Sequence, residues 1–168
     1  MPKIIENLES RLMAETKKQI ETIGYAATTI RSVAAGCGVG VGTVYNYFSS
    51  KDDLAAAYLL EDWKNCISAI HAVSEEAEHP MPVVQCIFDQ LRSFSRRHQA
   101  VFRDKEAAAS FTGSFSRYHG ILCSQLTVPL ERFFEDRFAA EFIAEAMLTW
   151  TMSGKEFETI YSMIGKLF

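Results

Sequence analysis

Residues 28–54 read TTIRSVAAGCGVGVGTVYNYFSSKDDL, and this stretch decides the fold of the first part of the chain. Its apolar positions from 30 to 37 recur at helical spacing, and Thr29 stands where the first turn of that helix needs a side-chain cap. Gly38 follows at the point where a tight turn between two helices requires a positive φ angle, which glycine adopts without steric cost. We therefore predict a short helix, a glycine turn and a second short helix.

The second short helix, expected over residues 41–48, has two different faces. Val44 and Phe48 lie four residues apart and form its inner face. Its other face is polar, aromatic and small at its start, with Thr43, Asn46 and Tyr47. Such a face fits the floor of a DNA major groove, so the stretch predicts a sequence-specific DNA-binding protein.

The flanking sequence completes a three-helix head. Apolar residues at 5, 8, 12, 20 and 23 predict a first helix over 4–23, which ends at Gly24. Ser50, with Asp53 three residues later, resembles a capping box for a long helix over 51–77.

The remainder of the chain also predicts helices, because proline is scarce and helix-forming residues are plentiful. The sequence His79-Pro80-Met81-Pro82 marks the clearest break. We expect helices over 82–98 and 99–109, then a kinked or divided helix over 111–134 that contains Gly113, Gly120 and Pro129, and finally two apolar helices over 138–150 and 157–167.

Composition and charge agree with a compact DNA-binding protein. Hydrophobic residues make up 48% of the 168 residues, and neither a signal peptide nor an apolar run long enough for a membrane span is present, so we expect a soluble cytoplasmic protein. The net charge is −4, but residues 1–51 hold six Lys or Arg against four Glu. A basic head on an acidic body would let phosphates approach one end only. Chance asymmetry is the alternative.

The cysteines, histidines and glycines point to no metal, no cofactor and no enzyme. The four cysteines are widely separated without a CxxC pair, and the four histidines form no HExxH array, so packing roles are favoured over zinc or redox sensing. Four glycines alternate between 36 and 42, but no phosphate-binding loop has that spacing and no strand precedes them.

The quoted stretch closely resembles the TetR family of bacterial transcription regulators. The positions that carry the resemblance are Thr29, Gly38, Val39, Gly42, Thr43, Val44, Tyr45, Tyr47, Phe48 and Lys51. It covers roughly the first 60 residues. Gly40 departs from the pattern, because family members usually carry serine or another side chain before the recognition helix.

The resemblance implies an all-helical homodimer with a helix-turn-helix DNA-binding domain at 1–50 and a helical effector-binding and dimerisation domain at 51–168. It implies a transcriptional regulator, with repression favoured, that binds a pseudo-palindromic operator in double-stranded DNA and is released by a small-molecule effector. The alternative is a helix-turn-helix dimer that senses no small molecule. The C-terminal portion is small for the family, which favours that alternative.

Roles in DNA binding can be assigned to the head. Phosphate contacts are expected for Thr43, Tyr45, Tyr47 and Lys51, and base reading for Val41 and Asn46. Arg31 could reach a guanine edge or a phosphate. As alternatives, Tyr45 packs inside the head and Arg31 is solvated surface. The full set of expected DNA-binding residues is Thr29, Arg31, Val41, Gly42, Thr43, Tyr45, Asn46, Tyr47 and Lys51.

The body supplies two further sets of candidates. Aromatic residues of the middle helices are candidates for the effector pocket, with simple core packing as the alternative: Trp63, Phe88, Phe94, Phe111 and Tyr118. The apolar stripes of the last two helices predict a four-helix interface with a second copy, with closure of the chain's own core as the alternative: Phe138, Phe142, Ala146, Trp150, Phe157, Ile160, Tyr161 and Ile164.

Overall fold

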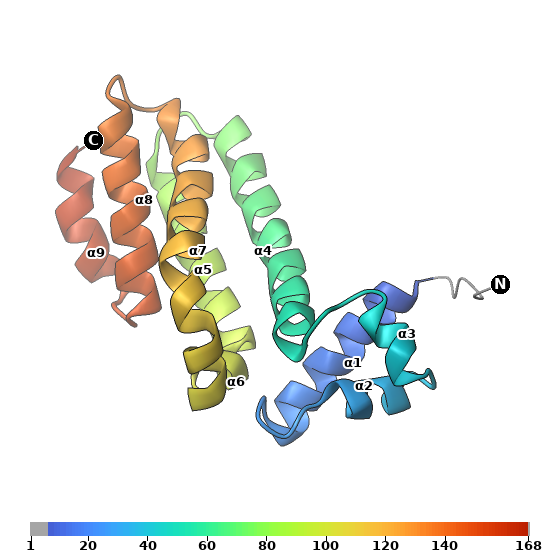
Figure 1. Ribbon diagram of the computed structural model, residues 1–168. Coiled ribbons are helices and arrows are strands. Elements are labelled where there is room, and N and C mark those ends of the chain that lie inside the picture. Colours follow the sequence, from blue (N-terminus) through green and yellow to red (C-terminus); the bar gives the residue numbers. More distant parts are fainter. Residues whose placement is uncertain (1–6, 168) are drawn as a thin grey trace. The chain divides into compact units, whose positions relative to one another are not determined.

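The computed structural model describes residues 7–167, apart from the side chains of residue 106 and residues 108–118. The regular structure in this range is helical, which confirms the predicted all-α fold (Figure 1). The chain forms two compact units, one made of Met1–Glu61 and His98–Gly113 and the other of Asp62–Arg97 and Ser114–Phe168. The predicted division at residues 50 and 51 stays a prediction.

The first unit contains the three-helix head. Its elements are α1 (Leu8–Ile23), α2 (Ile30–Gly36), α3 (Val41–Tyr45), the first part of α4 (Lys51–Glu76), α6 (Gln99–Phe102) and the beginning of α7 (Lys105–Glu131). The core between α1, α2, α3 and the start of α4 consists of Leu8, Leu12, Ile30, Val33, Ala34, Cys37, Val44, Phe48 and Leu54. The predicted inner residues of both short helices therefore share one core.

A second cluster in the same unit joins α6 and the beginning of α7 to the head. It consists of Ile20, Tyr25, Ala55, Tyr58, Val101 and Ala107. Tyr25 is fully buried although it lies in the connection between α1 and α2. A segment distant in sequence thus covers this side of the head.

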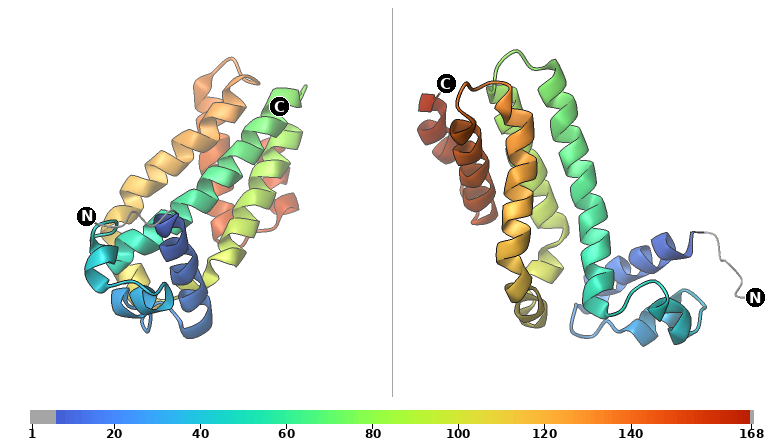
Figure 2. Two further views of the ribbon diagram at one scale, coloured as in Figure 1. Left: turned by 90° about the vertical axis from the view of Figure 1, so that its right-hand side faces the viewer. Right: turned by 45° about the horizontal axis from the view of Figure 1, so that its top comes forward.

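The second unit is a bundle made of the rest of α4 and α7 together with α5 (Met81–Arg97), α8 (Arg137–Met152) and α9 (Phe157–Ile164), followed by a 3₁₀ turn at Gly165–Leu167. Within it, α8 packs against α5 on one side and α9 on another (Figures 1 and 2). The predicted inner face of α5 is confirmed, since Val84, Ile87, Leu91 and Phe94 are all buried.

Polar contacts fix the order of these helices. Trp63 Nε1 donates a 2.6 Å hydrogen bond to Gln125 Oε1, which joins α4 to α7. Near the C-terminal end of each of these two helices, Ser74 Oγ donates a 2.6 Å hydrogen bond to the carbonyl oxygen of Pro129. Pro129 is the third residue from the end of α7, and because it lacks an N–H it cannot bond to the carbonyl group of Gln125 four residues back.

The head helices differ from the prediction at two boundaries. The first helix begins at Leu8 rather than at residue 4, because Asn7 adopts a left-handed conformation with φ 58°; residues 4–6 lie outside the described range. The third helix ends at Tyr45 rather than at Phe48. The N–H groups of Asn46 and Tyr47 bond to carbonyls three residues back, which tightens the last turn before the chain leaves the helix.

The middle of the chain differs more strongly. The expected helix over 99–109 is wrong, since α6 ends at Phe102 and α7 begins at Lys105. Asp104 separates them and accepts a 3.0 Å hydrogen bond from the N–H of Ala107, as a capping residue does. The helix expected to be kinked or divided over 111–134 is not divided up to Glu131, because α7 continues through Gly113 and Gly120 to that residue.

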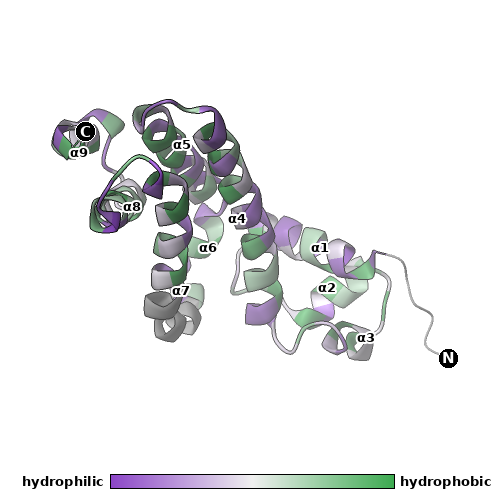
Figure 3. Ribbon diagram, turned by 90° about the horizontal axis from the view of Figure 1, so that it is seen from above, coloured by the Kyte–Doolittle hydropathy of each residue, from purple (hydrophilic) through white to green (hydrophobic). Residues whose placement is uncertain are grey.

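Two kinds of feature are absent from the part of the chain that the structure describes. No helix there is long and apolar enough to cross a membrane, and no group of three or more His, Cys, Asp or Glu side chains is arranged to hold a metal ion. In α8, whose sequence is mostly apolar, Figure 3 shows both hydrophobic and hydrophilic residues. All four cysteines are free thiols.

Candidate nucleic-acid interface

The start of α2 is fixed by a reciprocal pair of hydrogen bonds, as predicted for Thr29. Thr29 Oγ1 accepts from the N–H of Ser32 at 3.0 Å, while the N–H of Thr29 donates to Ser32 Oγ at 3.0 Å. Two of the N–H groups that a helix start leaves open are therefore satisfied.

The long helix α1 holds α2 at both of its ends. At the N-terminal end, Gln19 Nε2 donates to the carbonyl oxygen of Ser32 at 3.1 Å, and Ser32 Oγ donates to Gln19 Oε1 at 2.6 Å. At the C-terminal end, Arg11 Nη2 donates to the carbonyl oxygen of Cys37 at 2.9 Å. No local sequence pattern indicates either residue, because their partners lie 13 and 26 residues away in the chain.

The turn between α2 and α3 has the geometry that glycine allows. Gly38 has a φ of 67°, and its N–H donates to the carbonyl of Ala35 while the N–H of Val39 donates to the carbonyl of Ala34. This pair of bonds is the Schellman motif, which satisfies carbonyl groups at the end of a helix. Gly40 caps α3 without a side-chain hydrogen bond.

The two faces of α3 are separated as predicted. Val44 is fully buried and Phe48, just beyond the helix, is 7% exposed. By contrast, Tyr45 is 55% exposed and Tyr47 is 43% exposed, and Asn46 is exposed beside them. The end of α3 and the turn that follows it therefore present two phenol groups and an amide to their surroundings above the buried Val44, and Tyr45 does not pack inside the head.

The remaining DNA-binding candidates lie around this face. Arg31 and Gly42 are exposed, Val41 and Thr43 are half-buried, and Thr29 is exposed at the start of α2. A side chain at Gly42 would meet no atom within 4 Å, so this side of α3 is open. These candidates thus lie on α3 or at the start of α2, and their DNA-binding roles stay predictions.

Lys51 has contacts that the sequence did not indicate. Its ammonium group donates to the carbonyl oxygen of Tyr25 at 3.1 Å and lies 4.2 Å from the centre of the Tyr25 ring. The hydroxyl group of Tyr25 in turn donates to Asp52. Lys51 therefore ties the start of α4 to the connection between α1 and α2, whatever contact it makes with DNA.

The predicted cap of α4 is present. Ser50 Oγ accepts a 3.0 Å hydrogen bond from the N–H of Asp53. The Asp53 carboxylate accepts from the hydroxyl group of Ser49. In a full capping box, the Asp53 carboxylate would instead accept a hydrogen bond from the backbone N–H of Ser50.

A family model for bacterial regulatory proteins of the tetR family matches residues 12–58, which span the helix-turn-helix and its supports. This match identifies residues 12–58 as a segment of the TetR type. The HTH-type transcriptional regulator HbdR of Aromatoleum sp. (strain CIB) is 34% identical over 53 residues, which is 32% of this chain and 23% of that protein. The matched segment thus spans about a quarter of the curated relative.

Solved structures of TetR-type proteins share the fold over nearly the whole length. The TetR family repressor AlkX of Dietzia sp. superposes with a TM-score of 0.68 at 18% identity, over 95% of this chain and 92% of that chain. A transcriptional regulator of Streptomyces coelicolor A3(2) superposes with a TM-score of 0.70 at 16% identity, over 96% of each chain. The second unit therefore has the architecture found in TetR-type proteins.

Three of the five candidates for an effector pocket lie in the core of the second unit. Trp63, Phe88 and Phe94 are 3%, 5% and 8% exposed. The rings of Trp63 and Phe94 meet edge to face at 5.6 Å between centroids, and Phe88 lies 5.3 Å from Phe157. Phe111 and Tyr118 are outside the described side chains. The effector-binding role of these residues stays a prediction.

The candidates for a TetR-type dimer interface fall into two groups. Phe138 is 65% exposed, and Phe142 and Trp150 are each 50% exposed on α8. Buried or partly covered within their own chain are Ala146, Phe157, Ile160, Tyr161 and Ile164. The exposed members of the predicted set are thus on α8, while α9 exposes Met163, which was not among the predicted residues.

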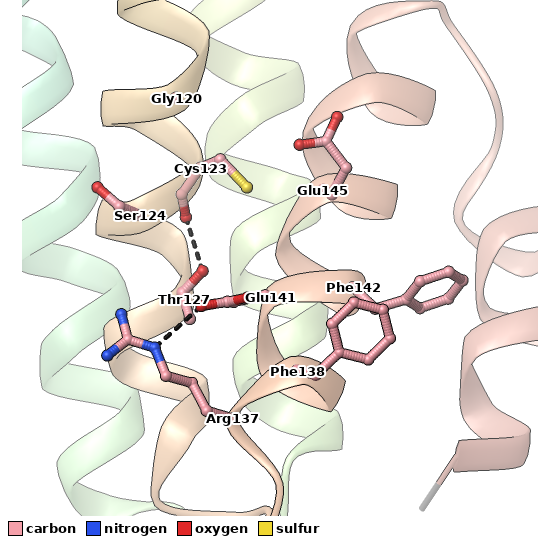
Figure 4. A pocket seen from close by; sticks show the side chains of 9 residues that line it. All are labelled: Gly120, Cys123, Ser124, Thr127, Arg137, Phe138, Glu141, Phe142 and Glu145. Atoms are coloured by element: carbon pink, nitrogen blue, oxygen red, sulfur yellow. Dashed lines mark hydrogen bonds and ion pairs between the residues drawn. The ribbon is translucent and has the colours of Figure 1, made fainter.

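A pocket of about 430 Å³ opens between α7 and α8 (Figure 4), lined by Gly120, Cys123, Ser124, Thr127, Arg137, Phe138, Glu141, Phe142 and Glu145. Arg137 Nε lies 3.0 Å from Glu141 Oε1. Burial, and then the neighbouring Glu145 carboxylate, raise the pKa of the Cys123 thiol to about 11. Of the predicted effector residues whose side chains the structure describes, Trp63, Phe88 and Phe94 do not line this pocket.

Proposed function

We propose that the chain is a transcriptional repressor that binds a pseudo-palindromic operator as a homodimer and leaves it when a small-molecule effector binds. The observation that carries the proposal is the outer face of α3, where Tyr45, Asn46 and Tyr47 are exposed while Val44 is fully buried. A recognition helix needs a rigid base and a free outer face in order to enter a major groove.

The roles of the head residues follow from their positions. Tyr45, Tyr47 and the half-buried Thr43 can donate hydroxyl hydrogen bonds to phosphates, which fixes the head on the duplex. Asn46 can form paired hydrogen bonds with an adenine edge, and Val41 can contact a thymine methyl group. Arg31 and Lys51 add positive charge at the two sides of the helix-turn-helix.

A dimer would place two such heads on one operator. Two recognition helices reach successive major grooves when they are about 34–36 Å apart, so half-sites one helical turn apart are expected. The exposed aromatic residues of α8 support association with a second copy, because a monomer gains nothing by keeping Phe138, Phe142 and Trp150 in water.

Selection of bound sequences from a random pool of duplex DNA tests this function. The expected consensus is an inverted repeat whose half-sites are spaced by one helical turn. Binding of that site, measured by fluorescence anisotropy at several salt concentrations, should weaken steeply as salt rises, because phosphate contacts release counterions. The absence of any enriched sequence at low ionic strength would refute the proposal.

The second candidate is a DNA-binding dimer that senses no small molecule. The close ring contacts among Trp63, Phe94, Phe88 and Phe157 favour it, because these side chains already fill space that an effector would occupy. Thermal-shift screening distinguishes the two candidates. An effector must weaken operator binding by the same factor by which the operator weakens effector binding, and a stabilising compound without this reciprocity is no effector.

A further inference from the structure

The pocket between α7 and α8 has short side chains on one side and long ones on the other (Figure 4). From α7 it is lined by Gly120, Cys123, Ser124 and Thr127. A side chain at Gly120 would meet no atom within 4 Å, so the α7 side is open at this point. The volume of about 430 Å³ lies in the range of sites that hold small organic molecules. The pocket thus has room for such a ligand.

The charged groups that line the pocket carry a negative excess. Glu141 and Glu145 are acidic, whereas Arg137 is basic. Figure 4 shows Glu141 pointing from α8 toward α7. Arg137 Nε lies 3.0 Å from Glu141 Oε1 and 3.3 Å from Glu131 Oε1, so one guanidinium group is shared between two carboxylates. This excess favours a cationic ligand and disfavours an anionic one.

Glu145 keeps its negative charge in this position. Its Oε1 lies 2.8 Å from His119 Nε2 and accepts a 3.0 Å hydrogen bond from Thr149 Oγ1. Burial opposes ionisation, but the hydrogen bonds with His119, Cys123 and Thr149 outweigh it and hold the pKa of Glu145 below its usual value. The Cys123 thiol keeps its proton near neutral pH, because its pKa is raised to about 11. The carboxylate is therefore available to attract a positive group.

Two aromatic rings form the apolar wall of the pocket. Phe138 and Phe142 are 65% and 50% exposed, and their ring centroids lie 6.4 Å apart with the planes tilted by 46°. The face of an aromatic ring attracts a cation, and its carbon atoms gain from burial against an apolar chain. An inorganic ion would use only the carboxylates, and a neutral apolar molecule only the rings. A molecule with a positive group and an apolar part uses both.

We propose that this pocket binds an amphipathic organic cation as the effector, with its positive group beside Glu141 and Glu145 and its apolar part against Phe138 and Phe142. The proposal rests on the effector-dependent release from DNA put forward above, and it specifies where the effector binds and to which chemical class it belongs. The site is distinct from the buried aromatic residues of the core, which already contact one another.

One helix of the pocket also contributes to the unit that contains the head. Residues 105–113 of α7 belong to the first unit and the rest of the helix to the second. Ala107 is fully buried in the cluster that contains Tyr25 and Tyr58, and the same helix lines the pocket from Gly120 onward. A ligand held against α7 therefore contacts a helix that is packed in both units. Operator affinity is expected to change when the pocket is occupied.

Three probes with the same apolar part and different charges test the ligand class. At pH 7, 4-phenylbutylamine is a cation, 4-phenylbutanol is neutral and 4-phenylbutyrate is an anion. Isothermal titration calorimetry should show saturable binding of the amine, about threefold weaker binding of the alcohol and still weaker binding of the anion, because a partly exposed charge contact contributes little more than that. Equal affinities would overturn the cationic class. No saturable binding of the amine up to about 10 mM would overturn the site.

A charge-removing substitution tests the role of the carboxylates. Glu145→Gln keeps the shape of the side chain, and it should reduce the ratio of amine affinity to alcohol affinity from about three to about one. A general loss of structure would weaken both probes and leave this ratio unchanged. Glu76→Gln is the matched control, because it removes the same charge from the exposed end of α4, outside the pocket. Equal loss of the ratio in both variants would contradict a local contact.

Filling the pocket tests its location. Gly120→Leu should weaken binding of 4-phenylbutylamine at least about tenfold without lowering the thermal stability, because leucine favours a helix more than glycine and enters open space. Ile121→Leu is the control, since its exposed side chain does not line the pocket. Unchanged binding in Gly120→Leu would place the amine elsewhere. Phe138 and Phe142 stay unchanged here, because they also belong to the surface proposed for association of two copies.

Fluorescence anisotropy with the selected operator separates the ligand site from the regulatory function. Saturating 4-phenylbutylamine should weaken operator binding by the unmodified protein, whereas Gly120→Leu should bind the operator and not respond. Binding of the amine in the pocket with unchanged operator affinity would overturn its role as the effector site. A protein that binds no DNA would refute the proposed function, and calorimetry would still decide whether the pocket binds an organic cation.

Discussion

The guanidinium group of Arg11 donates a 2.9 Å hydrogen bond to the carbonyl oxygen of Cys37, the residue that ends α2. This contact closes the C-terminal end of the helix that precedes the recognition helix. Together with the hydrogen bonds of Gln19 near the N-terminal end of α2, this contact fixes α2 against α1. The orientation of the helix-turn-helix thus depends on a helix that carries none of the predicted DNA contacts.

Arg11→Ala should lower the free energy of unfolding by about 1 kcal/mol, the typical contribution of a hydrogen bond, and should weaken operator binding further. Urea denaturation and fluorescence anisotropy measure the two effects. Lys18→Ala is the control, because Lys18 is 74% exposed in its side chain and pairs only loosely with Glu15 at 3.5 Å. Equal changes in the free energy of unfolding and in operator affinity for the two variants would contradict this role of Arg11.

Gly38→Ala should destabilise the head by about 1–2 kcal/mol, because alanine would have to adopt a φ of 67°. Nothing lies within 4 Å of the added methyl group, so the cost comes from the backbone conformation alone. Gly42→Ala is a matched comparison, since that position is helical and equally open; it should stabilise the protein by roughly 0.5–1 kcal/mol. Thermal denaturation measures the stability of both variants. A loss of stability in both would contradict the explanation from the φ angle of Gly38.

Lys51→Ala should reduce stability as well as DNA affinity, because the ammonium group holds the carbonyl group and the ring of Tyr25. A decrease of about 1 kcal/mol in the free energy of unfolding is expected. Lower affinity with a reduced salt slope would confirm a phosphate contact in addition. An unchanged stability would show that the Tyr25 contact contributes nothing.

Asn46→Ala should change which operator sequences are preferred, whereas Tyr47→Phe should weaken binding to all of them by a similar factor. The first variant removes a group able to read a base edge, and the second removes one hydroxyl group able to bond a phosphate. Binding to a panel of single-base operator variants measures both. If Asn46→Ala left the order of preference unchanged, its role in base reading would be wrong.

Cys123 should react with iodoacetamide about a hundredfold more slowly at pH 8 than an ordinary thiol, because its pKa is raised to about 11 and the thiolate is the reacting form. The same raised pKa means that the folded state keeps a proton that the unfolded state releases. The free energy of unfolding should therefore fall as the pH rises from 9 to 11, and Cys123→Ser should flatten that decrease. Alkylation of the protein in urea at pH 8 is the control.

Local signals predicted the head well. Thr29, Gly38 and Ser50 each act through contacts with residues three or four positions away, so short patterns were sufficient for the caps and the turn. The same patterns failed for α7. Gly113 and Gly120 suggested breaks, yet glycine inside a helix costs only about 1 kcal/mol, which packing of the long helix outweighs.

The contacts that position the site were beyond such patterns. Arg11 and Cys37 are 26 residues apart, as are Lys51 and Tyr25, and neither pair has a spacing that recurs in helices or turns. Only the packing of α1, α2 and α4 against one another brings these atoms together. The apolar residues of α8 and α9 could be recognised in the sequence. Which of them stay exposed depends on how α8 and α9 pack, and no local pattern shows that.

The two tryptophans occupy opposite environments, since Trp63 is 3% exposed and its indole nitrogen is bonded to Gln125, whereas Trp150 is 50% exposed on α8. Their fluorescence emission should therefore contain a short-wavelength component from the interior and a long-wavelength component that soluble quenchers reach. The protein thus contains two natural optical reporters, so loosening of the interior and covering of the surface can be followed separately without any attached dye.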